Sequence, residues 1–220
     1  MPYLWCSLLG YLLGMLNPAF FIAKIQGIDI RERGSGNAGA SNVLLVFGKL
    51  RGILCACLDI FKAFLAIRLA EWLFPEEDVF AVTAAACILG HIFPFYMKFR
   101  GGKGLACLAG VVLAYHPMVF ALMLTGALLL ALATGYICFV PMVGSVVFAA
   151  VYGCMTHDLW GTLMLLAVSA VIIVKHAANI RRIRAGREVR ICYLWNKERE
   201  TLRMKKNTPA EEWDHPEGES

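Results

Sequence analysis

The chain has 220 residues, of which 59% are hydrophobic and only 17% are charged, and its net charge is +5. A soluble domain is on average roughly 25% charged, so this composition excludes an ordinary soluble protein. Between Lys103 and Lys175 the sole charged side chain is Asp158, which leaves room for about three bilayer crossings of roughly 20 residues each. The apolar runs are continuous, whereas the strands of an outer-membrane barrel alternate. The sequence therefore predicts an all-α, polytopic membrane protein and no nucleic-acid-binding module.

Apolar segments can be separated along the whole chain. We expect seven transmembrane helices, at residues 3–25, 50–74, 79–97, 104–116, 117–134, 136–156 and 159–174. Two of these segments are shorter than the roughly 17 residues that a crossing requires. Each of the two must therefore extend into its loops or cross the bilayer only in part.

The basic residues are confined to one set of loops. All Lys and Arg except Lys62 and Arg68 fall within residues 24–51, 98–103 and 175–206, whereas the other connections carry acidic charges alone. With seven crossings, the basic stretches share one side of the membrane. By the positive-inside rule this side is the cytoplasm, so we expect the N-terminus outside and the C-terminus inside the cell.

The chain divides into a membrane domain at residues 1–187 and a cytoplasmic tail at residues 188–220. The basic part of the tail is expected to lie near anionic lipid headgroups. From Asn207 onward the tail has acidic residues and prolines but no bases, a composition typical of disorder.

The first of three polar clusters lies between the first two segments. It reads Arg33-Gly34-Ser35-Gly36-Asn37-Ala38-Gly39-Ala40-Ser41-Asn42. Glycine and asparagine permit positive φ and tight turns, and small side chains let backbone N–H groups line an anion-binding concavity. We expect Ser41 or Asn42 to cap the following helix. A flexible cytoplasmic loop is the alternative interpretation.

The second cluster, Lys98-Phe99-Arg100-Gly101-Gly102-Lys103-Gly104, directly precedes the fourth segment. Glycines between cations at the start of a helix combine free N–H groups, a positive helix dipole and mobile ammonium groups, which favours phosphate binding. It lacks the spacing of a Walker A loop. The alternative is a topological stop signal, which needs cations but has no use for glycines.

The third cluster lies where the last segment leaves the membrane, and it contains His176 and Asn179. Residues three apart share a helix face, so both side chains can act on one ligand. The alternative for this histidine is an interfacial hydrogen-bonding role.

Two further polar features lie inside apolar segments. Asp59 and Lys62 are three residues apart in the second segment, where an unpaired charge is costly. We predict a neutralising pair with a structural role. His91, in the third segment, is either a packed and hydrogen-bonded histidine or part of the site.

The three clusters resemble the signature blocks of the bacterial acyl-phosphate:glycerol-3-phosphate acyltransferases, the PlsY family. The matching residues are Gly34–Asn42, then Gly90-His91-Ile92-Phe93-Pro94 with Gly101–Gly104, then His176-x-x-Asn179-Ile180. The similarity covers residues 5–187 in order and spacing. It implies a seven-helix fold in the bacterial inner membrane, with the active site at the cytoplasmic face.

The resemblance also implies a reaction in which an acyl phosphate gives its acyl chain to the 1-hydroxyl of glycerol 3-phosphate. The products would be lysophosphatidate and phosphate, in phospholipid synthesis. The expected partners are these two substrates, membrane lipids and the enzyme that forms the acyl phosphate, with no metal or cofactor. Catalytic roles are implied for Ser35, Lys103, His176 and Asn179. Substrate-binding roles are implied for Gly34, Gly36, Asn37, Gly39, Ser41, Asn42, His91, Arg100, Gly101, Gly102 and Gly104.

The chain departs from the family pattern at a few positions, of which Leu45 matters most because the family usually has an arginine there. Arg100 or Arg51 could supply the missing cation. Two other interpretations follow. One is a diverged paralogue that binds phosphate-bearing lipid precursors with little or no activity. The other is a small transporter, which the lack of any internal repeat disfavours.

Overall fold

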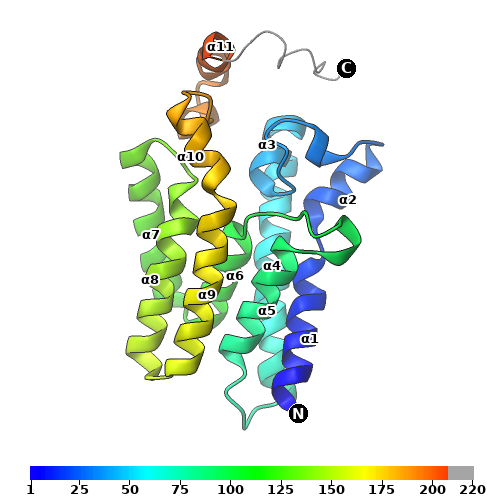
Figure 1. The fold of residues 1–220 in the computed structure, drawn as a ribbon, viewed down its shortest axis with the longest axis vertical. Helices are drawn as coiled ribbons and strands as arrows, with labels where there is room; N and C mark the ends of the chain where they lie inside the picture. Colours follow the sequence, from blue (N-terminus) through cyan, green and yellow to red (C-terminus); the bar gives the residue numbers. More distant parts are fainter. Residues whose placement is uncertain (208–220) are drawn as a thin grey trace.

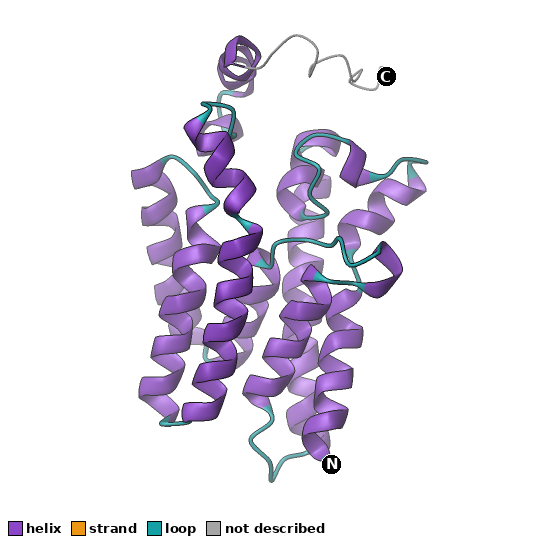
Figure 2. Cartoon of the chain, in the orientation of Figure 1, coloured by secondary structure: helices purple, strands orange, loops and turns teal. Residues whose placement is uncertain are grey.

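The computed structural model describes residues 1–207, apart from the side chain of Lys205, and folds them into a bundle of helices without strands (Figures 1 and 2). The α-helices are α1 (Pro2–Met15), α2 (Pro18–Ile25), α3 (Ala40–Phe47), α4 (Lys49–Leu73), α5 (Phe80–Ile92), α6 (Leu105–Tyr115), α7 (Pro117–Thr134), α8 (Phe139–Thr156), α9 (Leu159–Lys175), α10 (Ala177–Arg184) and α11 (Lys197–Asn207). Short 3-10 turns, η1 (Ile30–Glu32), η2 (Phe95–Met97) and η3 (Ile191–Leu194), connect some of them.

Each of the seven predicted segments forms a helix. The first one is interrupted, and in the third one α5 ends at Ile92 and the η2 turn follows. The segment at residues 3–25 consists of α1 and α2, separated at Leu16 and Asn17. Pro18 lacks the N–H that a continuous helix would use. The side chain of Asn17 accepts a hydrogen bond from Phe20 N (2.8 Å) and so caps α2. Periodicity alone did not predict this break.

Five helical segments are long and apolar enough to cross a membrane. They are Pro2–Ile25, Phe80–Met97, Pro117–Thr134, Phe139–Thr156 and Leu159–Arg184. Of the other two, α4 has 25 residues but carries several charges, and α6 has only 11 residues. The protein is therefore an all-α membrane protein with several crossings, while the count of seven and the orientation stay predictions.

Small residues let the helices of the core approach closely. A Cβ atom at Gly14 or at Gly90 would overlap the backbone of the facing helix, because α1 and α5 pack against each other there. The central core lies between α4, α5, α6, α8 and α9. A larger side chain at either glycine would push α1 and α5 apart.

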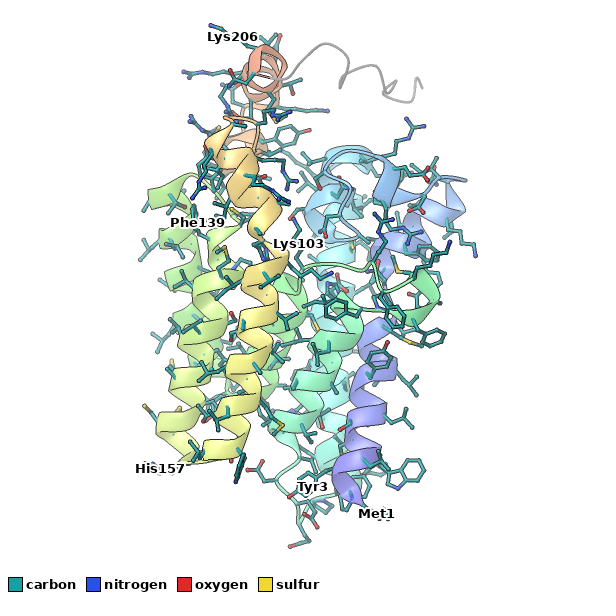
Figure 3. All side chains as sticks on the ribbon, in the orientation of Figure 1. Met1, Tyr3, Lys103, Phe139, His157 and Lys206 are labelled. Atoms are coloured by element: carbon teal, nitrogen blue, oxygen red, sulfur yellow. The ribbon has the colours of Figure 1, made fainter. Side chains whose placement is uncertain are left out.

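The predicted site loops lie at one end of the bundle. Figure 1 shows the loop that leads into α3, the loop that leads into α6 and the α9–α10 junction in its upper half. In Figure 3, Lys103 and Lys206 lie toward this end, whereas Met1, Tyr3 and His157 lie at the opposite end. The bundle therefore has a basic end that carries the polar clusters.

The basic part of the predicted tail is helical, since it contains η3 and α11. It attaches to the α7–α8 connection, where Ile191 N donates to Gly135 O (2.8 Å) and Arg190 Nε donates to the hydroxyl of Tyr136 (3.3 Å). The acidic end, which we predict to be disordered, lies outside the described residues from position 208 onward.

Candidate functional site

The first cluster is organised by Asn42, whose side chain is fully buried. Its Oδ1 accepts a hydrogen bond from Ser35 N (2.8 Å), and its Nδ2 donates to Ile30 O and to Arg33 O (both 2.9 Å). The prediction that Asn42 or Ser41 caps α3 is wrong. The helix begins at Ala40 after Gly39, without a side-chain cap, and Asn42 instead shapes the loop before it.

This arrangement requires glycine at Gly34 and leaves Ser35 accessible. Gly34 has a φ of +56°, and a Cβ atom there would overlap the side-chain oxygen of Asn42. Gly36, at +71°, also uses the left-handed region. Ser35, in the loop, and Ser41, in α3, are exposed, so both residues are accessible.

The second cluster is anchored to the end of α5 through its glycines. Gly101 N donates to Ile92 O and Gly102 N donates to His91 O (both 3.1 Å). These two N–H groups are therefore occupied in this structure, in contrast to the expectation that they are free to meet a phosphate. A Cβ atom at Gly102 would overlap the His91 ring and lie 3.0 Å from Ala38 O. Gly102 thus fits between the first cluster and α5.

His91 lies beneath the glycine loop and not on an open surface. It is 2% exposed, and its Nδ1 lies 3.0 Å from Lys62 Nζ and 3.3 Å from Asp59 Oδ1. The predicted Asp59–Lys62 ion pair is confirmed, with 2.6 Å between Nζ and Oδ1. The position of His91 supports the packed, hydrogen-bonded alternative over direct contact with substrate.

Asn17 also contributes to the site, and sequence reasoning missed it. Its buried Nδ2 donates to Ala38 O (3.0 Å), the same carbonyl that approaches Gly102. A polar residue directly before Pro18 is a typical helix cap. That signal was available in the sequence, although it could not reveal the contact with Ala38.

Lys103 joins the second cluster to the third. Its Nζ donates a hydrogen bond to Oδ1 of Asn179. Asn179 Nδ2 in turn donates to Glu188 Oε1 (2.6 Å), and Arg182 Nε donates to Glu188 Oε2 (2.7 Å). Glu188 and Arg182 were not predicted. An acidic residue within a basic run could have drawn attention to Glu188.

The surroundings of Lys103 lower the pKa of its ammonium group. Burial, together with repulsion from Arg182, lowers the pKa of the Lys103 ammonium to about 8, and the negative charge of Glu188 partly opposes that change. Lys175 also repels it. A lysine with this pKa is charged at neutral pH yet weakly hydrated, which suits it to binding an anion.

His176 lies at the junction of α9 and α10 and is 3% exposed. Its Nδ1 lies 2.8 Å from Ile172 O. A carbonyl oxygen can only accept, so Nδ1 carries the proton and Nε2 of the neutral ring keeps its lone pair. The ring is therefore oriented by the main chain of α9.

The candidate replacements for the family arginine occupy different places. Leu45 is half-buried on α3. Arg51 lies over the ring of Phe47, with 5.6 Å from Cζ to the ring centroid. Arg100 is exposed beside the glycine loop. Both remain candidates, and Arg182 is the guanidinium whose charge acts most strongly on Lys103.

Contacts thus link the three clusters, from Asn17 and Ala38 through Gly102 to Lys103 and Asn179. The family model described as "Glycerol-3-phosphate acyltransferase" matches residues 4–186. The chain belongs to the glycerol-3-phosphate acyltransferase family. It is an acyltransferase.

Relatives and solved structures agree with this membership. A glycerol-3-phosphate acyltransferase of Thermosipho melanesiensis is 37% identical over 189 residues, which cover 86% of this chain and 92% of the relative. Glycerol-3-phosphate acyltransferase 3 of Bacillus anthracis is 38% identical over 177 residues, which cover 80% and 88%.

Two crystal structures of PlsY, an integral membrane glycerol 3-phosphate acyltransferase, share the fold of this acyltransferase. The glycerol 3-phosphate form aligns with a TM-score of 0.80 and 33% identity, covering 88% of this chain and 98% of that chain. The lysophosphatidic acid form aligns with a TM-score of 0.77 and 32% identity, covering 92% and 99%.

Proposed function

We propose that this acyltransferase uses an acyl phosphate as donor and produces lysophosphatidate and inorganic phosphate from glycerol 3-phosphate. The observation that carries the proposal is the contact of Lys103 with Asn179. This contact joins the glycine loop to the third cluster, and Gly102 of the same loop lies against Ala38 of the first cluster. Two substrates that both bear phosphate need two adjacent groups of donors.

The chemistry requires little beyond positioning. The 1-hydroxyl oxygen of glycerol 3-phosphate attacks the acyl carbonyl carbon, a new ester C–O bond forms, and the bond from that carbon to the phosphate oxygen breaks. Phosphate leaves with the electron pair. An acyl phosphate is a mixed anhydride and already reactive, so alignment and charge stabilisation supply most of the rate.

The residues of the site divide these tasks. The ammonium of Lys103 balances the charge of a phosphate, and the Asn179 side chain orients it. Nε2 of His176 is available to accept the proton of the attacking hydroxyl, because Nδ1 is occupied by Ile172 O. The exposed Ser35 and Ser41 offer hydroxyl donors to the second phosphate or to the acyl carbonyl.

We place the site at the cytoplasmic face of a bacterial inner membrane. The support is the distribution of charge, since the end of the bundle that carries the clusters also carries nearly all Lys and Arg. The positive-inside rule assigns this end to the cytoplasm, where glycerol 3-phosphate is dissolved, while the acyl donor arrives through the lipid.

The test uses purified protein in lipid nanodiscs, with palmitoyl phosphate and labelled glycerol 3-phosphate. We expect labelled lysophosphatidate and an equal amount of released phosphate. Palmitoyl coenzyme A and palmitoyl acyl-carrier protein, assayed in parallel, should give no product. Product from a thioester alone would contradict the proposed donor.

One observation favours the alternative of a diverged, weakly active paralogue. Leu45 stands where the family usually has an arginine, and its side chain can neither donate a hydrogen bond nor carry charge. The loss of a charge-assisted hydrogen bond is worth about 1.5–3 kcal/mol. A turnover that rises several-fold when Leu45 is changed to Arg would support this alternative.

A further inference from the structure

Lys62 lies deep within α4, yet it contacts two segments that hold the site loops. Its Nζ lies 2.5 Å from Leu16 O, 2.6 Å from Asp59 Oδ1 and 3.0 Å from His91 Nδ1. An ammonium group has three N–H donors, and here three acceptors surround it. The side chain is 6% exposed, so water is no substitute for these partners.

The first contact leads to the first cluster. Leu16 lies at the break between α1 and α2. In a continuous helix Phe20 N would donate to Leu16 O, but here it donates to the side chain of Asn17 (2.8 Å). Leu16 O accepts from Lys62 Nζ instead. The next residue, Asn17, holds Ala38 O through its Nδ2 (3.0 Å). Lys62 is therefore connected, through Leu16 and Asn17, to the loop that carries Ser35.

The second contact leads to the glycine loop. Lys62 Nζ fixes Nδ1 of His91, and the opposite edge of the same ring faces Gly102, where a Cβ atom would overlap it. Gly102 N also donates to His91 O (3.1 Å). Gly102 in turn lies against Ala38 O. The contacts therefore close into a ring that starts and ends at Lys62.

We propose that Lys62 is a positioning residue that sets the separation of the two substrate loops, with Asp59 as its counter-ion. The inference rests on the proposed function, because it takes the two loops as the places where both substrates bind. A neutralising pair would only need Asp59 and Lys62 to meet each other. The contacts with Leu16 O and His91 Nδ1 are not needed to neutralise charge, and both lead to the segments that hold the loops.

The test removes the pair together, because a single substitution would leave a buried charge unpaired. The double variant Asp59→Leu with Lys62→Met keeps the apolar volume and the net charge. The matched control is Arg68→Met with Glu71→Leu. The members of that pair are also three residues apart on α4, with 2.7 Å between Arg68 Nη1 and Glu71 Oε2. Arg68 also donates to a carbonyl oxygen, that of Ala114, which lies away from the site loops.

Two readouts separate positioning from simple stability. The first is hydrogen exchange of peptides covering residues 93–104, whose Gly101 and Gly102 amides are bonded to α5. We expect exchange at least tenfold faster in the site pair and unchanged exchange in the control pair. The second is kcat/KM for glycerol 3-phosphate, which we expect to fall at least tenfold in the site pair alone.

Coupling to Gly102 sharpens the kinetic readout. If Lys62 acts through the ring of contacts, Gly102→Ala should reduce kcat/KM less in the Asp59→Leu, Lys62→Met background than in the parent, and equally in the control background. Should the double variant fail to fold, Lys62→Arg preserves the charge opposite Asp59. Its larger planar group cannot occupy the same position, so loop exchange should again be faster.

The outcomes are distinct. Parental exchange and parental kinetics in the site pair, even with a lower Tm, would overturn the proposal and leave Asp59 and Lys62 as a neutralising pair. A parent that makes no lysophosphatidate would contradict the proposed function instead. The exchange comparison would still decide whether Lys62 holds the loops, because it needs no turnover.

Discussion

The Nζ atom of Lys103 donates a hydrogen bond to the side-chain oxygen of Asn179, although 76 positions separate the two residues along the chain. This contact connects the start of α6 to α10. Glu188 holds the other end of the Asn179 amide (2.6 Å), so the oxygen is kept toward Lys103. An ammonium group that is already oriented loses less entropy when a phosphate replaces or joins its partner.

Lys103→Ala should lower kcat/KM for glycerol 3-phosphate about tenfold to a hundredfold. A hydrogen bond to a charged group is worth about 1.5–3 kcal/mol, and about 1.4 kcal/mol is tenfold. The control is Lys98→Ala, which removes an exposed lysine from the same loop. Equal effects of the two substitutions would mean that only the local positive potential matters.

Activity should fall as the pH rises through about 8. The pKa of Lys103 is lowered to about 8 by burial and by Arg182. The ammonium is charged below this pKa and neutral above it, so phosphate binding weakens on the alkaline side. A pH profile of kcat/KM measures this limb. A flat profile up to pH 10 would contradict a charged Lys103 in substrate binding.

Glu188→Gln should move that alkaline limb to lower pH. The negative charge of Glu188 raises the pKa of Lys103, so its removal lowers the pKa further, while glutamine can still accept from Asn179. The charges that remain around Lys103, Arg182 on α10 and Lys175 on α9, both repel it. Glu198→Gln, an exposed site on α11, should leave the profile unchanged.

Gly34→Ala should reduce turnover, whereas an alanine at another glycine with positive φ should not. The residue has a φ of +56°, and a Cβ atom there overlaps Asn42 Oδ1. Gly27→Ala is the matched control, because Gly27 has a φ of +72° with no atom within 4 Å. Each alanine costs about 1–2 kcal/mol in left-handed backbone. Because of the overlap, we expect a larger drop in Tm in Gly34→Ala than in Gly27→Ala, and a loss of turnover in Gly34→Ala only.

Leu45→Arg and Arg100→Ala together test how the chain compensates for the missing arginine. If Arg100 supplies the cation, Arg100→Ala should reduce kcat/KM at least tenfold and Leu45→Arg should be neutral or harmful. If nothing supplies it, Leu45→Arg should raise a low turnover several-fold. If neither the parent nor any variant forms lysophosphatidate from any donor, the interpretation as a binding paralogue replaces the interpretation as an enzyme.

The sequence by itself determined the class of protein and the approximate positions of its apolar helices, but not the break at Leu16 and Asn17. Long apolar runs between charged loops have few alternatives to transmembrane helices, since backbone polar groups in lipid must be satisfied within the segment. It also predicted which loops carry the chemistry, because the glycines, serines and cations at residues 34–42 and 98–104 are themselves the signal.

Only the tertiary structure decided what each of those residues contacts. Asn42 shapes its loop and does not cap α3, the amides of Gly101 and Gly102 bind α5, and His91 lies beneath the loop. Asn17 meets Ala38, which is 21 positions away, and Glu188 meets Asn179 from beyond the end of α10. Such pairings depend on how closely α1, α5 and α9 pack and on where each helix ends. Local composition and periodicity contain no record of those three-dimensional distances.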